Sequence, residues 1–157
     1  MFMGLHSLQT MRLSFEQICQ GQEPWVALGN FMNDWYELHR DCREQLIIDP
    51  LPENYPSEFH YWAAFCAASA EWFAHQYKVP CPSWVFAPKY HLATPHFTSE
   101  KEALRSYYLS ETPEEFRRRN IFCGNRMFAN KWEALDELKA RRRTFTEKDR
   151  HVSSHQL

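Results

Sequence analysis

Hydrophobic side chains recur every three or four residues over the segment 25–46. This spacing is that of one face of an α-helix, and Pro24 suits the first turn of such a helix. Asp49 and Pro50 come soon after the segment, and a proline disfavours the helical conformation of the residue before it. We therefore expect one long amphipathic helix that ends before Asp49, with an apolar stripe formed by Trp25, Leu28, Met32, Trp35, His39, Cys42 and Leu46.

A second helical pattern covers residues 59–77, with large aromatic side chains at its ends and the small-residue run AAFCAASA in the middle. Small side chains allow a neighbouring helix to approach closely. Both features fit a helix that is surrounded by the rest of the protein, so we expect it to lie at the centre of the fold. Cys66, within the run, is interpreted as a small core residue.

Shorter patterns predict four more helices. Ser14 opens a brief apolar face that stops at Gly21, and another helix follows Ser99. Thr112 precedes Pro113 as the cap of a short helix, and Asn130 caps a last helix whose end is basic over residues 139–143. Residues 121–123 form either a single strand or an extended plug. The pattern is that of an all-α fold, a compact single-domain bundle of five or six helices.

The segment 80–97 carries several prolines and aromatics. It is too proline-rich to form regular structure and too apolar to be exposed to water. We expect a long ordered proline-aromatic loop in which Trp84 and Phe97 are well buried. From about Thr144 the periodicity is lost, which predicts a helical domain over residues 1–143 and a disordered tail over residues 144–157.

Composition narrows the class of protein. The 157 residues suit one domain, and Lys+Arg 18 against Asp+Glu 20 gives no overall basic charge, so direct binding to nucleic acid is not expected. No apolar run is long enough to span a membrane, and the first residues lack the features of a secretory signal. Five widely spread cysteines favour the cytoplasm over an oxidising compartment. The four glycines form neither a dinucleotide-binding nor a phosphate-binding loop, and no cofactor is predicted.

Histidines and one cysteine offer candidate metal ligands. The set is His75, Cys81, His91 and His96. Its spacing matches no common zinc motif, and His91 and His96 are too far apart to share one face of a helix. A metal-binding protein or small enzyme that uses this set is the alternative hypothesis, whereas a structural role is favoured for its members.

Arginines and loop aromatics are candidates for a partner-binding surface. Three consecutive arginines cover most of a helix circumference, so at least one of them should meet a carboxylate or a helix carbonyl, inside the domain or across an interface. The helix macrodipole explains part of the cation clusters at residues 117–119 and 139–143. The predicted partner-binding residues are Trp84, Phe86, Tyr90, Phe97, Arg117, Arg118 and Arg119.

Several motifs resemble an uncharacterised bacterial helical module. They include W-x-x-L-G-x-F-x-x-x-W-Y at residues 25–36, P-x-W at residues 82–84 and T-P-E-E-F-R-R-R-N-I-F at residues 112–122. That module occurs alone or after a helix-turn-helix domain, in proteins that look like regulators or antitoxin components. The resemblance covers about residues 24–132 and transfers no catalytic residue. It implies a compact intracellular helical domain that binds a partner protein.

The sequence therefore favours a non-catalytic interaction or regulatory protein over an enzyme. The expected partner is another protein, with a homodimer as a further arrangement that the sequence leaves open.

Overall fold

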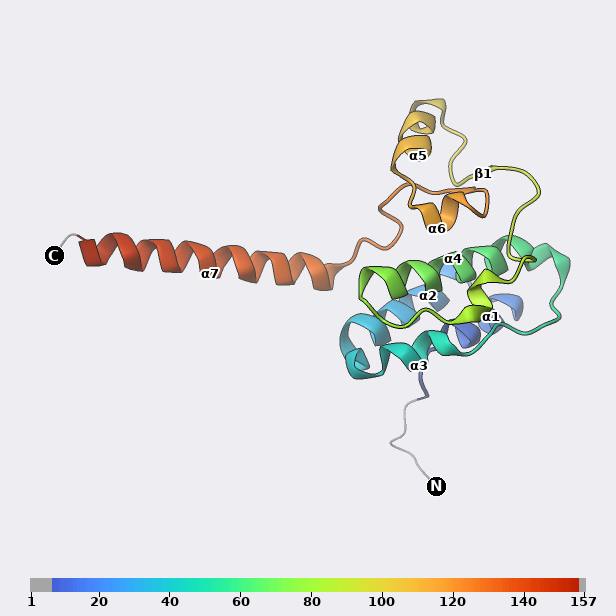
Figure 1. Cartoon of the computed structure of the whole chain (residues 1–157), viewed down its shortest axis with the longest axis horizontal. Coiled ribbons are helices and arrows are strands. Elements are labelled where there is room, and N and C mark those ends of the chain that lie inside the picture. Colours follow the sequence, from blue (N-terminus) through green and yellow to red (C-terminus); the bar gives the residue numbers. More distant parts are fainter. Residues whose placement is uncertain (1–6, 156–157) are drawn as a thin grey trace, which may run out of the picture. The chain divides into compact units, whose positions relative to one another are not determined.

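The computed structural model describes the backbone of residues 7–155 and the side chains of residues 7–144 (Figure 1). Within this range the regular structure is helical except for two strands of two residues each, which confirms the predicted all-α class. The chain divides into two compact units, Met1–Asn125 and Arg126–Leu157. The first six residues of the segment inspected for a secretory signal, and the last two of the predicted tail, lie outside the described residues.

Helix α1 spans Met11–Cys19 and begins three residues before the predicted start. Its cap is Thr10, whose Oγ1 accepts a hydrogen bond from Leu13 N at 3.0 Å, whereas Ser14 is buried inside the helix. The helix ends where Gly21 takes a φ of +103°, a left-handed conformation that glycine adopts without strain.

The predicted long helix is interrupted. Helix α2 spans Pro24–Asn33, continues as a π-turn over Asp34–Leu38 and a 3-10 turn over Arg40–Cys42, and is followed by α3, Arg43–Ile48. Arg43 contacts the backbone and the side chain of Trp35 in this interruption. Its Nε donates a hydrogen bond to Trp35 O at 3.0 Å, and its guanidinium lies 5.2 Å from the centre of the Trp35 ring. The end before Asp49 is as predicted.

Helix α4, His60–Gln76, is the central helix of the larger unit. It packs against α1 and against α6, Glu114–Arg117 (Figure 1). Its small side chains and the rings of Phe65 and Phe73 are buried, as the sequence predicted, and Cys66 is fully buried among them, whereas Trp62 and Trp72 are only half-buried. The buried set is Ala63, Ala64, Phe65, Cys66, Ala67, Ala68, Ser69, Ala70, Glu71, Phe73 and Ala74.

Enlarging a side chain in this helix tests its packing. Ala67 is completely buried, so Ala67→Leu should lower the free energy of unfolding by about 1–3 kcal/mol through overpacking. Chemical denaturation measures the loss. The same substitution at the exposed Ala93 should change stability by less than about 0.5 kcal/mol, and equal effects at both positions would place Ala67 outside the core.

The proline-aromatic segment is ordered and contains a 3-10 turn over Ser83–Phe86 and strand β1, His96–Phe97. Its buried anchors are Val85 and Tyr90. Trp84 and Phe97 are only half-buried, which corrects the prediction that both lie in the core. Each side chain has a contact that keeps it near the surface. Trp84 Nε1 donates a hydrogen bond to Ile47 O at 2.9 Å, and the centre of the Phe97 ring lies 4.2 Å from the guanidinium carbon of Arg105.

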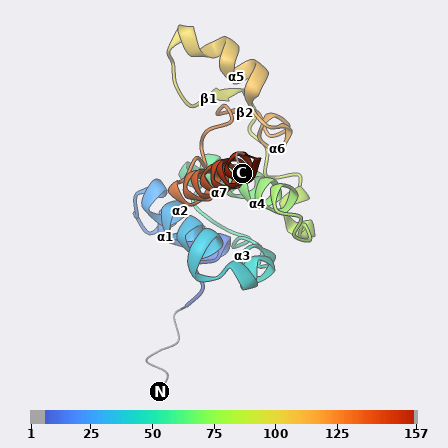
Figure 2. The same ribbon diagram turned by 90° about the vertical axis from the view of Figure 1, so that its left-hand side faces the viewer.

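Strand β1 pairs in parallel with β2, Ile121–Phe122, so the first two residues of the apolar run at 121–123 form a strand (Figure 2). Ile121 lies opposite His96 and Phe122 opposite Phe97. Parallel strands need a long crossover connection. Here the connection contains α5, Arg105–Glu111, and α6.

Thr112 does not cap the helix that follows it, contrary to the sequence-based prediction. Its Oγ1 donates to Tyr108 O at 2.6 Å, in the last turn of α5, and accepts from Gly124 N at 2.8 Å. The backbone of Pro113 starts α6 instead, by accepting from Phe116 N and Arg117 N. Thr112 therefore ties the end of α5 to the segment after β2.

Helix α7 spans Lys131–His155 and belongs to the smaller unit. Asn130 caps it as predicted, because Asn130 Oδ1 accepts from Glu133 N at 2.8 Å. The helix continues past Thr144, where we expected a disordered tail, since residues 144–155 contain neither glycine nor proline to end it. The larger compact unit ends at Asn125. Among the described helices, none combines the length and apolar character that crossing a bilayer requires.

Candidate functional site

Phe86 and Arg118 meet at the surface of the larger unit. The 3-10 turn Ser83–Phe86 leaves the Phe86 ring 54% exposed while its neighbour Val85 is fully buried. The guanidinium of Arg118, at the end of α6, lies 6.0 Å from the centre of that ring, and its side chain is 41% exposed. This distance allows a cation-π interaction. An aromatic ring and a cation are thus presented together to solvent.

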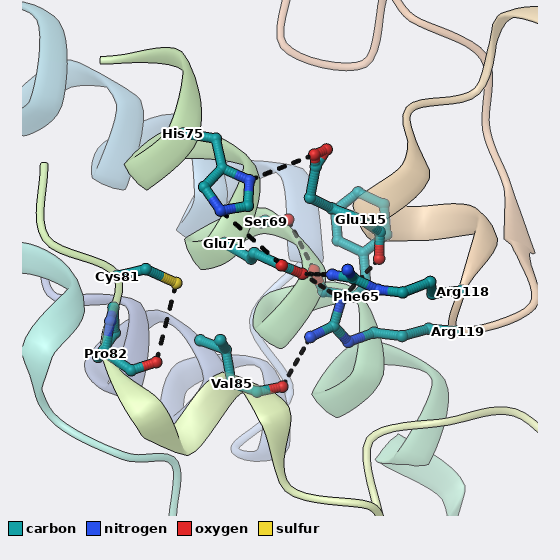
Figure 3. A network of polar contacts seen from close by, with 10 residues as sticks. All are labelled: Phe65, Ser69, Glu71, His75, Cys81, Pro82, Val85, Glu115, Arg118 and Arg119. Atoms are coloured by element: carbon teal, nitrogen blue, oxygen red, sulfur yellow. Dashed lines mark hydrogen bonds and ion pairs between the residues drawn. The ribbon is translucent and has the colours of Figure 1, made fainter. Parts of the chain in front are cut away.

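Beneath this surface a buried carboxylate holds Arg118 in place (Figure 3). Glu71, on α4, is 1% exposed, and its Oε1 accepts hydrogen bonds from both Arg118 Nη2 and Arg119 Nη1. Burial alone raises the pKa of Glu71, but the two arginines outweigh that effect and lower the pKa below its ordinary value. The carboxylate is therefore charged at neutral pH. We call Glu71, Arg118 and Arg119 the Glu71 ion cluster.

Arg119 is the interior member of this cluster. Its side chain is 3% exposed, and Nη1 donates to Glu71 Oε1 at 2.8 Å and to Glu115 O at 2.6 Å. Nη2 donates to Val85 O at 2.6 Å, which links the 3-10 turn of Phe86 to α4 and α6 (Figure 3). Three chain segments are thereby joined by one side chain.

Arg118 is the outer member. Only Nη2 is engaged by Glu71, while Nη1 and Nε have no hydrogen-bond partner within the part of the chain that the structure describes. Arginine has five N–H donors, so this side chain keeps free donors although one of its nitrogens is anchored. The position of those donors is set before any ligand arrives.

His75 lies beside the cluster, one turn of α4 beyond Glu71. Its Nε2 is 4.0 Å from Glu71 Oε2 and its Nδ1 is 3.6 Å from Glu115 Oε2. The imidazole side chain is half-exposed, so it closes one side of the ion cluster without sealing it from water.

The structure gives no geometric support to the alternative hypothesis of a metal site. His91 is exposed and contributes its backbone carbonyl to His60 Nε2, and the ring of His96 lies against Tyr61, 4.3 Å between centres. Across residues 7–144, no three His, Cys, Asp or Glu side chains are grouped so that they could hold a metal ion. His75, Cys81, His91 and His96 are therefore not brought together as one set.

Cys81 does not have the environment of a reactive thiol. Burial and the nearby charge of Glu71 raise its pKa above the ordinary value, against a smaller opposing effect of Arg119 and Arg118. A nucleophilic cysteine needs a lowered pKa, because the thiolate is the reacting form. Cys81 is thus a neutral thiol at pH 7.

The remaining predicted partner-binding residues are spread over different environments. Trp84 contacts the buried Tyr90 edge to face, 6.0 Å between ring centres. Phe97 stacks on a different ring, that of Phe122, with 4.9 Å between the ring centres. Arg117 is exposed. Of the predicted set, the structure brings Trp84 against Tyr90 and Arg118 against Phe86, and it buries Tyr90 and Arg119.

Glu71 was missed in the sequence analysis. A signal was present: it is the single acidic residue within the apolar helix 60–76. An acid in a helix that is buried all round must have a cationic partner. The three arginines at 117–119 were expected to include one that meets a carboxylate, and that prediction is confirmed within the domain for Arg118 and Arg119.

Comparisons with known proteins found no family model that matches the chain, and no match among curated proteins or solved structures.

Proposed function

We propose that the protein is a non-catalytic interaction or regulatory protein that binds another protein through Phe86 and Arg118. One observation carries this proposal: a half-exposed aromatic ring lies beside an arginine that is anchored from below and has free donors above. Aromatic residues and arginine dominate the binding energy of protein interfaces. Fixing them in advance reduces the entropy that is lost on binding.

The chemistry of the surface indicates what it would bind. The free guanidinium nitrogens of Arg118 suit a carboxylate, and the exposed face of Phe86 suits an aliphatic or aromatic side chain. A partner segment with an acidic residue next to an apolar one satisfies both. Such a segment is a common feature of protein surfaces, so we propose a protein partner and not a small molecule.

The regulatory, antitoxin-like role implied by the family resemblance is part of the same proposal. A regulator of that type acts by binding a partner protein, which a surface without a nucleophile can do. The cysteines at positions 19, 42, 66, 81 and 123 are all free thiols in the structure, which fits a cytoplasmic protein.

Removing the Phe86 ring tests the proposal. Phe86→Ala should weaken partner binding by about 2 kcal/mol, or about thirtyfold in Kd, because a central aromatic contact is lost. The melting temperature should stay nearly unchanged, because the ring is half in water already. Tagged full-length protein is used to capture partners from its own cells, and the affinity is then measured with the purified partner.

Leu109→Ala is the matched control, since Leu109 is 47% exposed on α5 and belongs to no predicted surface. A captured protein counts as the partner only if Leu109→Ala retains it and Phe86→Ala loses it. Equal capture by both variants would remove Phe86 from the interface and contradict the proposal.

A further inference from the structure

A cavity of about 160 Å³ lies between helix α1 and the proline-rich connection that follows α3. The ring of Phe15, which is completely buried, forms its inner wall. The ring of Tyr55 stands edge to face against Phe15, with 5.2 Å between the ring centres, and Pro52 and Pro56 extend the apolar wall. An apolar cavity of about 150 Å³ holds one benzene ring. The inner part of this cavity therefore suits an apolar group no larger than that.

Oxygen acceptors without partners lie at the outer end of the cavity. The side chains of Gln20 and Asn54 line it, are exposed, and have no hydrogen-bond partner within residues 7–144. Glu16 Oε1 accepts a hydrogen bond from Arg12 Nε at 3.1 Å, whereas Glu16 Oε2 has no partner in the same range. Arg12 is held there by a second acceptor, because its Nη1 donates to Pro50 O at 2.8 Å. Three acceptors are thus available at the mouth.

The electrostatic influence on the cavity wall is that of acids. Burial raises the pKa of the Cys19 thiol, which lines the cavity, and the carboxylates of Glu16 and Glu58 raise it further, with no cation offsetting them at this position. Glu58 has no ion-pair partner among the side chains that the structure describes. Lys89 lies near the tyrosine ring of the cavity, but its Nζ donates to Glu53 O at 3.1 Å. A cation at the mouth would therefore be attracted and an anion repelled.

We propose that this cavity binds a small organic ammonium ion, a primary amine that carries one apolar group of about the size of a phenyl ring. The apolar group lies against Phe15 and Tyr55. The ammonium group has three N–H donors, which match the acceptors of Glu16, Gln20 and Asn54. A neutral apolar molecule would cover these acceptors without supplying donors, which costs free energy.

The order of the two regions favours a free amine over a lysine side chain of a partner protein. A free amine enters with its apolar group first and keeps its charge at the mouth, next to water. A lysine side chain enters with its charge first and would bring the ammonium against the buried Phe15 ring, where the wall is apolar. None of the lining residues belongs to the Phe86–Arg118 surface, so this inference does not depend on the proposed function.

Benzylamine is the probe, because it joins a phenyl ring to a primary ammonium that is charged at pH 7. Two-dimensional NMR of isotope-labelled full-length protein should show saturable amide shifts in residues 15–20 and 53–55, with a Kd of about 1–10 mM for a ligand of this size. Benzyl alcohol keeps the ring without the charge and should bind at least about tenfold more weakly. N-acetyl-lysine amide, which represents a lysine side chain, should bind at least about tenfold more weakly as well.

Glu16→Gln tests the charge at the mouth. It should weaken benzylamine binding at least about tenfold and leave the binding of benzyl alcohol unchanged, because the variant keeps the shape of the side chain. The fold should persist, since Glu16 is partly exposed and loses only a surface ion pair. Glu44→Gln is the matched control, because Glu44 is an exposed acid on α3 that does not line the cavity. It should leave the affinity for both compounds unchanged.

Four results would overturn the proposal. The first is the absence of saturable shifts in residues 15–20 and 53–55 up to about 50 mM benzylamine. The second is equal affinity for benzyl alcohol, and the third is wild-type affinity in Glu16→Gln, because the charge would then have no role. The fourth is binding of N-acetyl-lysine amide as tight as that of benzylamine, which would assign the cavity to a side chain of a partner protein.

Discussion

Glu71→Gln is expected to lower the free energy of unfolding by about 3–5 kcal/mol, because it leaves the buried guanidinium of Arg119 without its counter-ion. The substitution keeps the shape of the side chain, so the loss reports on charge and not on a cavity. Urea denaturation at pH 7 measures it. The matched control is Glu16→Gln, which breaks the exposed ion pair with Arg12 and should cost no more than about 1 kcal/mol.

A double variant separates the charge of the cluster from its other roles. Glu71→Leu combined with Arg119→Met removes both buried charges and should recover most of the stability that Glu71→Leu alone loses. Recovery would show that the buried charge of Arg119 causes the loss. A cost for Glu71→Gln as small as that for Glu16→Gln would mean that the cluster is open to water, contrary to its burial in the structure.

The stability difference between the wild type and Glu71→Gln should also depend on pH in a defined way. The pKa of Glu71 is lower in the folded protein than its ordinary value of about 4.3, so its charge stabilises the fold fully above that value. The stabilisation is lost as the pH falls through the lowered folded pKa. The stability difference between wild type and Glu71→Gln should therefore be constant from about pH 6 to 8 and shrink below about pH 4.3. A difference that grows on acidification would contradict this linkage.

Phe73→Ala should lower the free energy of unfolding by about 3–5 kcal/mol, since it opens a cavity in the middle of an aromatic core. Phe73 is fully buried, and its ring centre is 4.9 Å from that of Trp35 and 5.2 Å from that of Phe31. Those rings come from α2 and the π-turn, so the cavity would separate α4 from both. Urea denaturation with an unchanged m-value would show that only stability has been altered.

Trp72→Ala is the natural comparison, because Trp72 is the adjacent residue on α4 and is only half-buried. Despite the larger ring, its removal should cost clearly less than the removal of Phe73. The reverse order would mean that the buried face of α4 has been assigned incorrectly.

Local patterns were sufficient for helices whose signal is short-ranged. Pro24 starts α2, Asn130 caps α7, and the run of small residues in α4 predicted a buried helix. In each case the deciding interaction lies within one or two turns of the chain, so neighbouring residues carry it. The all-α class followed from these patterns.

Boundaries depended on distant residues. The break between α2 and α3 involves Arg43, which bonds the carbonyl of Trp35 and lies over the ring of Tyr77 from the end of α4. Threonine is a preferred N-cap residue type, but the Thr112 hydroxyl donates a hydrogen bond to Tyr108 O and accepts one from Gly124 N. Capping preference is worth about 1 kcal/mol, and tertiary hydrogen bonds of similar strength can override it.

The candidate site shows the same division. The three consecutive arginines at 117–119 and the single acid in an apolar helix are both visible in the sequence, and the chemistry of burial requires that such groups pair. Which arginine lies inside and which carries the free donors beside Phe86 depends on how α6 packs on α4. The sequence by itself determined the helical class and the central helix, because these follow from local spacing. It also required that at least one of the three arginines meet a carboxylate or a helix carbonyl, inside the domain or across an interface, because of the cost of burying charge. Only the tertiary structure decided the π-turn, the half-burial of Trp84 and Phe97, and the Phe86–Arg118 surface, because each depends on side chains that are more than thirty residues apart or on elements that meet only in the folded chain.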